Sequence, residues 1–210
     1  MRPDDASGPP SFSVTPMFPT FLFVHDHSDP ARMNDRLIEF SYAARAADPT
    51  GRVISSRGGW QSNPEMRLRP ELQSLIRFIY ETIARVKVFL DIVDRFDLQV
   101  SDMWININGK GGYNTPHIHG NTYFGGVYYV KTHAGCGQIQ FRESSNIREY
   151  HCPPYAKITP RNCFVQQCAA EAGRLCIFPA YLPHEVAENT VEEERISIAF
   201  NIAGAMRPPA

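Results

Sequence analysis

The chain has 210 residues, of which 43% are hydrophobic and 20% are charged, and its net charge of −1 at pH 7 comes from interspersed charges of both signs. This length and composition fit one soluble globular domain with a sizeable core, and the charge balance predicts neither a nucleic-acid-binding nor an anionic-membrane surface. No apolar run approaches the roughly 20 residues that cross a bilayer, and no secretion signal opens the chain, so we expect no membrane partner and a cytoplasmic location.

The N-terminal half predicts a helical support region over about residues 32–95. Residues 1–11 are rich in Pro, Gly, Ser and Asp, which indicates a flexible segment before a single domain at 12–206. Extended segments at 12–16 and 18–24 precede an amphipathic helix at 34–47, and a glycine pair predicts a loop at 58–62. Apolar residues at three- and four-residue steps predict a long helix at 70–94 that packs outside a sheet and could offer a homodimer face.

From residue 98 onward the sequence predicts short strands separated by turns. The candidates are 98–108, 122–131, 137–141, 155–158, 175–178 and 195–202. Six strands after a helical region favour a mainly β fold with flanking α-helices. We therefore expect a double-sheet jelly roll, cupin-like, with its core at about 98–202.

Three histidines form a candidate site for one metal ion. His117 and His119 are two residues apart where a strand begins, so in extended backbone both imidazoles project to the same face. His184 lies in a proline-flanked turn between two strand candidates. Three neutral imidazoles can hold a divalent first-row metal such as iron and leave positions open for a substrate and O₂. A pair of turn histidines is the alternative, and His25 and His27 repeat the spacing where a surface turn or helix cap explains it.

A candidate anion-binding group follows the third histidine. Arg195 opens an apolar strand whose alternate residues should point into the barrel, and Ser197 shares its face. Arginine can grip a carboxylate through two hydrogen bonds, whereas a surface ion pair with a neighbouring glutamate is the alternative. Tyr129 could donate its hydroxyl to the same carboxylate or be a core tyrosine.

A mixture of polar and aromatic residues is expected to contact the substrate. Asn106 could line a polar cavity or take part in a structural hydrogen-bond network, and Trp60 and Gln61 could form a lip or anchor their loop. Arg142 is a candidate for binding a carboxylate of the substrate. The predicted substrate contacts are Trp60, Gln61, Asn106, Tyr113, Asn121 and Arg142. This set suits a small polar metabolite and is compatible with a peptide side chain.

Several short motifs, taken in this order, resemble the iron(II)- and 2-oxoglutarate-dependent oxygenase superfamily, and most closely a bacterial and phage subgroup of it. They are Gly-Gly-Trp-Gln-Ser (58–62), Trp-Ile-Asn-Ile-Asn (104–108), His-Ile-His (117–119), Gly-Gly-Val-Tyr-Tyr-Val (125–130), Phe-Pro (178–179) with His184, and Glu-Arg-Ile-Ser-Ile-Ala-Phe-Asn (194–201). The resemblance implies a double-stranded β-helix fold, an iron(II) cofactor and 2-oxoglutarate as co-substrate.

By position, the resemblance makes His117 and His184 the histidine ligands, and Arg195 with Ser197 and Tyr129 the group that binds the far carboxylate of 2-oxoglutarate. His119 stands where the superfamily has an aspartate or glutamate ligand, so a neutral third ligand would leave more positive charge on iron. The implied activity is hydroxylation, or another oxidation of a C–H bond, of a small polar substrate with O₂. No catalytic residues are expected beyond the metal ligands.

Two other functions stay open at this point. Thiol dioxygenases such as cysteine dioxygenase use three-histidine iron without 2-oxoglutarate, and Arg195 would then hold the substrate's own carboxylate. Their motif has a glutamate soon after the second histidine, and none lies between His119 and Lys131. The second is a non-enzymatic jelly-roll binding protein. The three histidines and the intact Arg-x-Ser both count against this hypothesis.

Overall fold

The computed structural model describes residues 12–145 and 147–208, so the flexible segment predicted at 1–11 lies outside the described residues. The elements in chain order are β1 (Phe23–Asp26), α1 (Ala31–Ala47), β2 (Ser56–Gln61), the short 3-10 helices η1 (Met66–Leu68) and η2 (Pro70–Leu72), α2 (Gln73–Phe89), β3 (Phe96–His117), β4 (Phe124–Lys131), β5 (Ile139–Arg142), α3 (Ile147–Tyr150), β6 (Val165–Cys168), β7 (Arg174–Pro179), β8 (His184–Val186) and β9 (Arg195–Met206).

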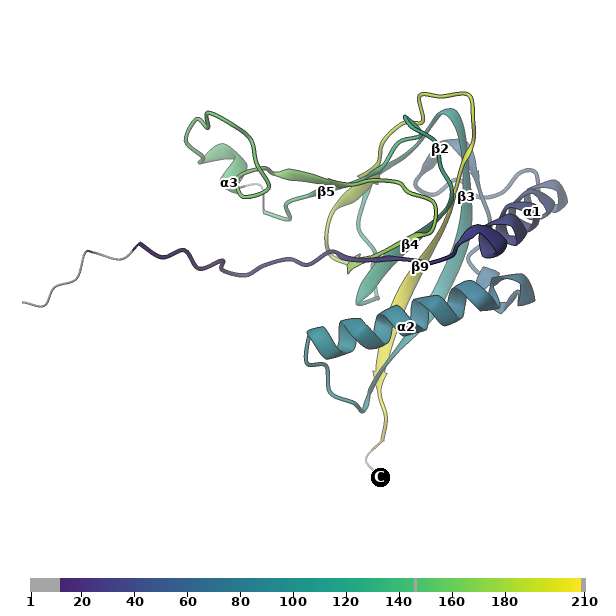
Figure 1. Cartoon of the computed structure of the whole chain (residues 1–210), viewed down its shortest axis with the longest axis horizontal. Helices are drawn as coiled ribbons and strands as arrows, with labels where there is room; N and C mark the ends of the chain where they lie inside the picture. Colours follow the sequence, from purple (N-terminus) through teal and green to yellow (C-terminus); the bar gives the residue numbers. More distant parts are fainter. Residues whose placement is uncertain (1–11, 146, 209–210) are drawn as a thin grey trace, which may run out of the picture.

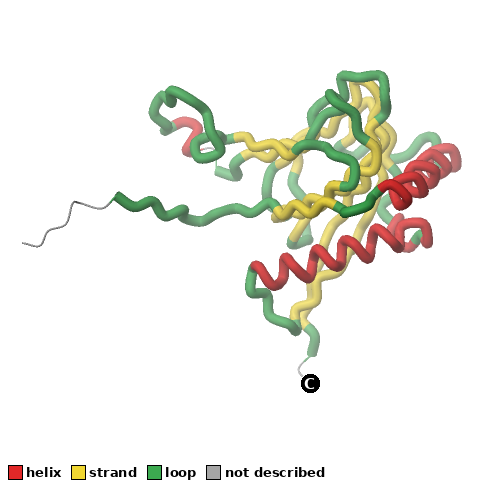
Figure 2. The backbone as a smooth tube through the Cα atoms, viewed as in Figure 1, coloured by secondary structure: helices red, strands yellow, loops and turns green. Residues whose placement is uncertain are grey.

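The strands form one curled antiparallel sheet with α1 and α2 together on one side of it (Figures 1 and 2). The strand order is β1-β7-β4-β9-β3-β8-β5-β6, and β2 pairs with β3. The long strand β3 pairs with β9 over Phe96–Asn108 and with β8 near its other end. The predicted mainly β fold with flanking helices is confirmed.

Side chains of the central strands alternate between a helix-facing side and an inner side of the curled sheet. Fully burying an aliphatic or aromatic side chain stabilises the fold by about 1.5–3 kcal/mol, so this shared core holds the helices on the sheet. The helix-facing cluster includes Ile105, Ile107, Tyr128, Ile196, Ile198 and Phe200 from the sheet, and Leu37, Leu75, Ile79 and Ile83 from the helices. The intervening residues of β3, β4 and β9 face the inside of the roll.

A β-bulge in β3 changes which of its residues face the helices. Leu98 and Val100 belong to the helix-facing cluster before the bulge, and Met103 belongs to it afterwards. The register with β9 shifts between Val100 and Asp102, so Ser101 is the extra residue. Unbroken alternation would point Asp102 toward the helices, whereas the bulge turns it to the inner side.

The loop predicted at 58–62 is wrong, because these residues belong to β2 and its end. A Cβ atom at Gly59 would lie 2.5 Å from Asn108 Nδ2 and 2.9 Å from the Ile107 carbonyl oxygen. Glycine here allows β2 to approach β3 closely. The glycine pair thus marks a tight strand pairing, with a register shift between Arg57 and Gly59.

Other boundaries differ from the predictions in ways that follow from long-range pairing. The strand predicted at 155–158 is wrong, since this segment between Pro154 and Pro160 joins no ladder and β6 pairs with β5 instead. The strand β8 has only three residues and was not predicted. The helix predicted at 70–94 is divided into η2 and α2, and α2 ends at Phe89.

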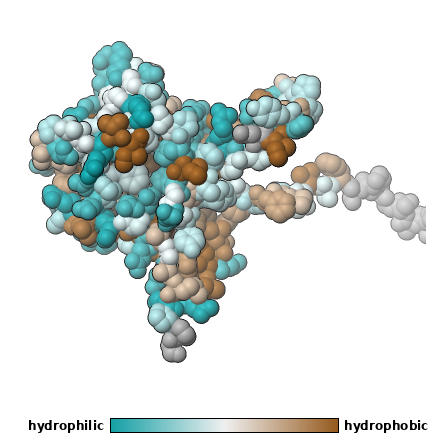
Figure 3. All heavy atoms as spheres, turned by 180° about the vertical axis from the view of Figure 1, so that it is seen from behind, coloured by the Kyte–Doolittle hydropathy of each residue, from teal (hydrophilic) through white to brown (hydrophobic). Residues whose placement is uncertain are grey.

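The surface seen from behind is mostly hydrophilic, with several apolar patches and a larger apolar area in the lower part of the view (Figure 3). The described part of the stretch that precedes β1, from residue 12 onward, extends away from the body of the molecule (Figure 1). Among the described helices, none has the length and apolar character needed to cross a membrane. The homodimer face expected on the long helix stays a prediction.

Candidate metal centre

The fold brings the three predicted histidines together. His117 at the end of β3 is the register partner of His184 at the start of β8, and the backbone N–H of His119 donates to the Ala180 carbonyl 2.9 Å away. One ring nitrogen from each imidazole lies within 4.8 Å of the other two. Strand pairing therefore unites ligands that are 65 residues apart in the sequence.

Each imidazole has one ring nitrogen fixed by an oxygen acceptor. His117 Nδ1 lies 2.7 Å from the Thr115 carbonyl oxygen, and His184 Nδ1 lies 2.9 Å from the Leu182 carbonyl oxygen. His119 Nδ1 contacts Asn201 Oδ1. Because a carbonyl oxygen can only accept a hydrogen bond, each Nδ1 carries the proton and each Nε2 presents a lone pair.

The spacing of these lone pairs fits a metal ion. His119 Nε2 and His184 Nε2 lie 3.1 Å apart, and two unprotonated nitrogens at this distance repel each other unless a cation lies near both. Two imidazole nitrogens bound at right angles, each about 2.1 Å from one metal ion, would be about 3.0 Å apart. The residues present therefore suit a metal ion held by three Nε2 atoms.

Burial keeps two of these imidazoles neutral. Desolvation, with a smaller contribution from the neighbouring His117, lowers the pKa of His184 to about 3. Desolvation is also the largest cause that lowers the pKa of His119 below its ordinary value. Neutral imidazole is the form that binds metal, so neither ligand has to lose a proton near neutral pH.

Aromatic side chains surround part of the centre. The Phe178 ring meets His184 edge to face at 4.6 Å between centroids, and Trp104 stacks on His119 at 6.0 Å. A Cβ atom at Gly125 would lie 2.8 Å from the Phe178 ring and 3.4 Å from His119 Cε1. These contacts limit the orientations open to the imidazoles and exclude water from one side of them.

Arg195 is a buried cation that lacks a charged partner. Its side chain is only 1% exposed, and its Nη1 donates to the carbonyls of Cys136 at 2.6 Å and Ala187 at 3.4 Å. Its Nε is buried without a hydrogen-bond partner. None of the ion pairs in the described part of the chain includes Arg195. A buried charge without a counter-charge costs several kcal/mol, so this position suits an anionic ligand.

A row of polar side chains crosses four strands beside Arg195. The register pairs Gln61 with Asn106, Asn106 with Ser197, and Ser197 with Tyr129. Strand alternation places this row on the same inner side as Asn201. The amide oxygens of Gln61 and Asn106 are buried without partners. Native proteins leave few such groups unpaired, so the row suits a polar ligand.

Tyr129 remains able to donate a hydrogen bond in this row. Burial is the main cause that raises the pKa of its phenol above the ordinary value, so the hydroxyl stays protonated. Its oxygen accepts a hydrogen bond from the Ile139 backbone N–H at 3.3 Å. The hydroxyl proton is therefore free to be donated to a ligand.

The structure places the other predicted substrate contacts away from this row. Trp60 lies in the helix-facing cluster and its indole N–H donates to the Asp48 carbonyl at 2.7 Å, so its position does not support a substrate contact. Tyr113 is 41% exposed, and Asn121 is an exposed turn residue with a φ of 59°. Arg142 is exposed and forms an ion pair with Glu149 at 3.7 Å.

Sequence reasoning missed two residues behind His119. Asn201 touches His119 and also donates from its Nδ2 to Asp102 Oδ2 at 3.2 Å. Asn201 could have been found, because it lies six residues after Arg195 and thus on the same strand face. Asp102 could also have been found, because it lies four residues before Asn106 and thus on the same strand face, with the bulge at Ser101 on its other side.

The second His-x-His pair has a structural role. His25 Nδ1 lies 2.8 Å from Thr82 Oγ1 on α2, and His27 Nδ1 accepts the Asp29 backbone N–H at 3.1 Å. Within 12–145 and 147–208, His117, His119 and His184 are the one group of three or more candidate ligands close enough to share a metal ion. His25 thus lies in β1 rather than in the expected surface turn, whereas His27 follows the strand and bonds to the backbone two residues on.

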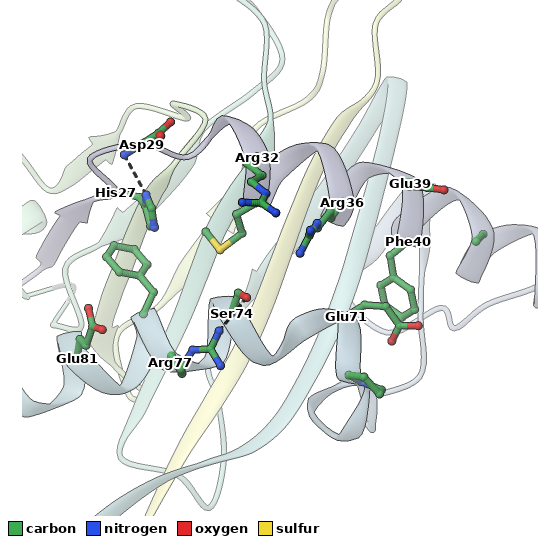
Figure 4. Close-up of a pocket in the computed structure, with 14 residues that line it drawn as sticks. His27, Asp29, Arg32, Arg36, Glu39, Phe40, Glu71, Ser74, Arg77 and Glu81 are labelled. Atoms are coloured by element: carbon green, nitrogen blue, oxygen red, sulfur yellow. Dashed lines mark hydrogen bonds between the residues drawn. The ribbon is translucent and has the colours of Figure 1, made fainter.

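A separate groove of about 1050 Å³ lies between α1 and α2 (Figure 4). Arginines and acidic residues from both helices line it, and none of the proposed site residues does. In the close-up, Arg32 and Arg36 on α1 face Arg77 on α2 across the groove. Because its charged side chains are exposed and of mixed sign, this groove carries no defined site.

Comparison with known proteins agrees with this geometry. Residues 102–201 match the family described as "Putative 2OG-Fe(II) oxygenase", and this segment contains the three histidines and Arg195. No curated protein matches the sequence.

Solved structures share the fold at low sequence identity. A prolyl-4-hydroxylase from Pseudomonas putida is 15% identical, with a TM-score of 0.58 over 87% of this chain and 92% of that chain. The alpha-ketoglutarate-dependent epimerase SnoN from nogalamycin biosynthesis is 13% identical, with a TM-score of 0.63 over 90% and 79%. A prolyl hydroxylase from Trichoplax adhaerens, solved with a hypoxia inducible factor peptide, is 13% identical, with a TM-score of 0.61 over 87% and 83%.

These likenesses confirm the predicted jelly-roll fold, and the family match covers the strands that carry the candidate centre. The match over residues 102–201 and the shared fold agree with the predicted iron(II)- and 2-oxoglutarate-dependent oxygenase, whose family uses iron(II) as cofactor and 2-oxoglutarate as co-substrate.

Proposed function

We propose that this oxygenase hydroxylates, or otherwise oxidises a C–H bond of, a small polar substrate, with His117, His119 and His184 as its iron ligands. The observation that carries the proposal is that the Nε2 lone pairs of three imidazoles converge. The Nδ1 proton of each imidazole is donated to an oxygen acceptor. Iron(II), when bound there with 2-oxoglutarate and O₂, supplies the oxidant that removes hydrogen from the substrate.

We assign the far carboxylate of 2-oxoglutarate to Arg195, with Ser197 and Tyr129 as hydrogen-bond donors. The buried guanidinium has an unpartnered Nε and no ion-pair partner among the described residues, which supports an anion beside it. Its Nη1 is fixed by two carbonyls, so the fork is held in place before the ligand arrives. Preorganised donors of this kind bind an anion without first having to be reordered.

The proposed substrate is small and polar because of the side chains left without partners. Gln61 and Asn106 have buried amide oxygens that accept no hydrogen bond, so a ligand with N–H or O–H donors would satisfy them. Tyr113, Asn121 and Arg142, which are exposed, remain proposed contacts. Solved relatives include one that holds a peptide and one that holds nogalamycin RO, so both small molecules and peptides belong in a substrate screen.

The test is an anaerobic titration with iron(II), followed by ultraviolet-visible spectroscopy with and without 2-oxoglutarate. We expect a weak visible charge-transfer band when both are present, because 2-oxoglutarate that chelates iron(II) through two oxygens gives such a band. His184→Ala should abolish iron binding. Arg195→Ala should keep iron binding, but a higher concentration of 2-oxoglutarate should be needed to produce the band.

The other outcomes each contradict part of this proposal. Iron binding without any band would reject the 2-oxoglutarate assignment at Arg195 and favour the thiol dioxygenase alternative, which cysteine and related thiols would then test. Failure to bind iron would reject the assignment of the three histidines and favour a binding protein. Consumption of 2-oxoglutarate without a hydroxylated product would reject hydroxylation and leave the other C–H oxidations.

A further inference from the structure

The third imidazole is held differently from the other two. His117 and His184 each donate from Nδ1 to the carbonyl of the residue two positions earlier in the chain. His119 instead faces the side-chain amide of Asn201, 82 residues away. A backbone carbonyl can only accept a hydrogen bond. A side-chain amide presents either its oxygen or its NH₂ group, depending on its rotation by ~180° about the terminal C–C bond. The tautomer of His119 therefore depends on the orientation of the Asn201 amide.

Asp102 determines that orientation. Asn201 Nδ2 donates to Asp102 Oδ2 at 3.2 Å, and Ser101 Oγ donates to the same oxygen at 2.8 Å. An ionised carboxylate can only accept hydrogen bonds, so the NH₂ group of Asn201 must face Asp102. The amide oxygen then faces His119 and accepts its Nδ1–H, which leaves Nε2 unprotonated.

The fold makes this arrangement rigid. Asp102 and Asn201 are register partners on β3 and β9, so their side chains leave the sheet side by side. The bulge at Ser101 is what turns Asp102 to the inner side. The carboxylate is thus placed by backbone pairing, and the Asn201 side chain needs no further support to span the gap to His119.

We propose that Asp102 and Asn201 are positioning residues for the metal centre. Asp102 sets the orientation of the Asn201 amide, and Asn201 holds His119 in the Nδ1–H tautomer whose Nε2 binds the metal. A hydrogen bond from a ligand's far nitrogen to a polarised acceptor also makes the ligand more basic. This chain therefore keeps a carboxylate behind its third ligand, separated from His119 by one hydrogen-bonded residue, Asn201. The inference rests on the proposed role of His119 as a ligand.

The first test compares the wild type with Asp102→Asn, which removes the charge and keeps the shape. Without a carboxylate that only accepts, the Asn201 amide can turn, and the Nε2–H tautomer of His119 should appear. Long-range ¹H–¹⁵N spectra of the metal-free protein at about pH 8 report the tautomer directly. Calorimetric titration with Co(II) should give an affinity lower by about 10- to 100-fold, as is usual when the hydrogen-bond partner of a metal ligand is lost.

Two further variants separate positioning from a merely structural role. Ser101→Ala removes a hydrogen bond to the same oxygen of Asp102 but keeps the carboxylate, so tautomer and affinity should stay as in the wild type. The double variant Asp102→Asn with Asn201→Asp exchanges carboxylate and amide, so that an obligate acceptor again faces His119. It should restore the Nδ1–H tautomer and recover Co(II) affinity, which a loss of packing would not allow.

The outcomes also distinguish this inference from the proposed function. The positioning role is overturned if Asp102→Asn, shown by thermal unfolding to be folded, keeps both the His119 tautomer and the Co(II) affinity of the wild type. It is also overturned if the exchanged double variant behaves like Asp102→Asn. If the tautomer changes as expected but even the wild type binds no metal, the role of Asp102 and Asn201 in setting the His119 tautomer stands and the proposed iron site fails.

Discussion

Single glycines decide how close two groups can come at this site, and Gly137 is the clearest case. It has a φ of 81°, in the left-handed region that favours glycine, and a Cβ atom there would meet the Ala187 carbonyl oxygen and lie 2.7 Å from Arg195 Nη1. The Ala187 carbonyl oxygen accepts a hydrogen bond from Arg195 Nη1 and so helps to fix the guanidinium. The absence of a side chain at Gly137 is thus part of how the cation is held.

We predict that Gly137→Ala weakens 2-oxoglutarate binding by at least about tenfold, because displacing a bidentate partner of a carboxylate costs more than 1.4 kcal/mol. Metal binding by the three histidines should persist, because the substitution lies on the Arg195 side. Calorimetric titration of 2-oxoglutarate into the Mn(II)-loaded protein measures the first effect, and titration with Mn(II) alone measures the second.

Gly135→Ala is the matched control. Gly135 has nearly the same backbone angle, with a φ of 84°, but its added Cβ would meet Thr190 and Val191 at 3.1 Å rather than Arg195. It therefore imposes a similar backbone strain without touching the guanidinium. Equal 2-oxoglutarate affinity in the wild type and in Gly137→Ala would refute the role assigned to Arg195.

At the scale of elements, an ion pair ties α1 to the start of β9. Arg45 Nη1 and Nη2 donate to the two carboxylate oxygens of Glu194 at 2.7 and 3.3 Å. Desolvation by itself raises the pKa of Glu194, but hydrogen bonds from Arg45 and Tyr42 outweigh it and leave the pKa below its ordinary value. The two side chains are 35% and 29% exposed, so solvent weakens the pair. We expect it to contribute about 1 kcal/mol.

Arg45→Met should lower the melting temperature by about 2–4 °C at pH 7.5. Because the folded-state pKa of Glu194 is lowered, the pair stabilises the protein above the unfolded pKa of about 4.3, and this contribution is lost as the pH falls through the folded-state pKa. The difference between variant and wild type should therefore shrink below about pH 4.5. Thermal unfolding at pH 7.5 and at about pH 4 checks this.

A double-mutant cycle with Glu194→Gln gives the control, since Arg45→Met should add little in that background. A difference that is equally large at both pH values would point instead to packing of the arginine on Tyr42, whose ring lies 5.2 Å from the guanidinium carbon.

At the scale of the whole molecule, metal binding should stabilise the fold, because the three ligands are brought together only in the folded chain. A ligand that binds only the folded state at 100 times its dissociation constant adds about 2.7 kcal/mol. For a chain of this length that corresponds to about 5–10 °C in melting temperature. Thermal unfolding with Mn(II) or Co(II), and then with a chelator, should show a gain that the chelator reverses.

His184→Ala should lose this metal-dependent gain. His25→Ala is the control, because His25 is bonded to Thr82 and should affect only the metal-free baseline. A gain of the same size in His184→Ala would mean that the stabilising metal binds elsewhere.

Features that depend on short-range periodicity could be predicted from the sequence. The two-residue spacing of His117 and His119, the shared face of Arg195 and Ser197, and the apolar stripe of α2 all follow from side-chain directions within one element. For the same reason the jelly-roll class could be predicted from the run of strands. The motif resemblance then added iron and 2-oxoglutarate, which spacing alone left open.

Features that depend on which strands pair, and in what register, could not be predicted before the fold was known. Pairing of β3 with β8 brings His184 to His117, and the register of β2 turns Gln61 inward and Trp60 toward the helices. The register of β3 with β9 puts Asp102 beside Asn201, and so behind His119. A single-residue shift reverses every side chain after it, and the choice is fixed by burial against distant elements, which no local pattern in the sequence contains.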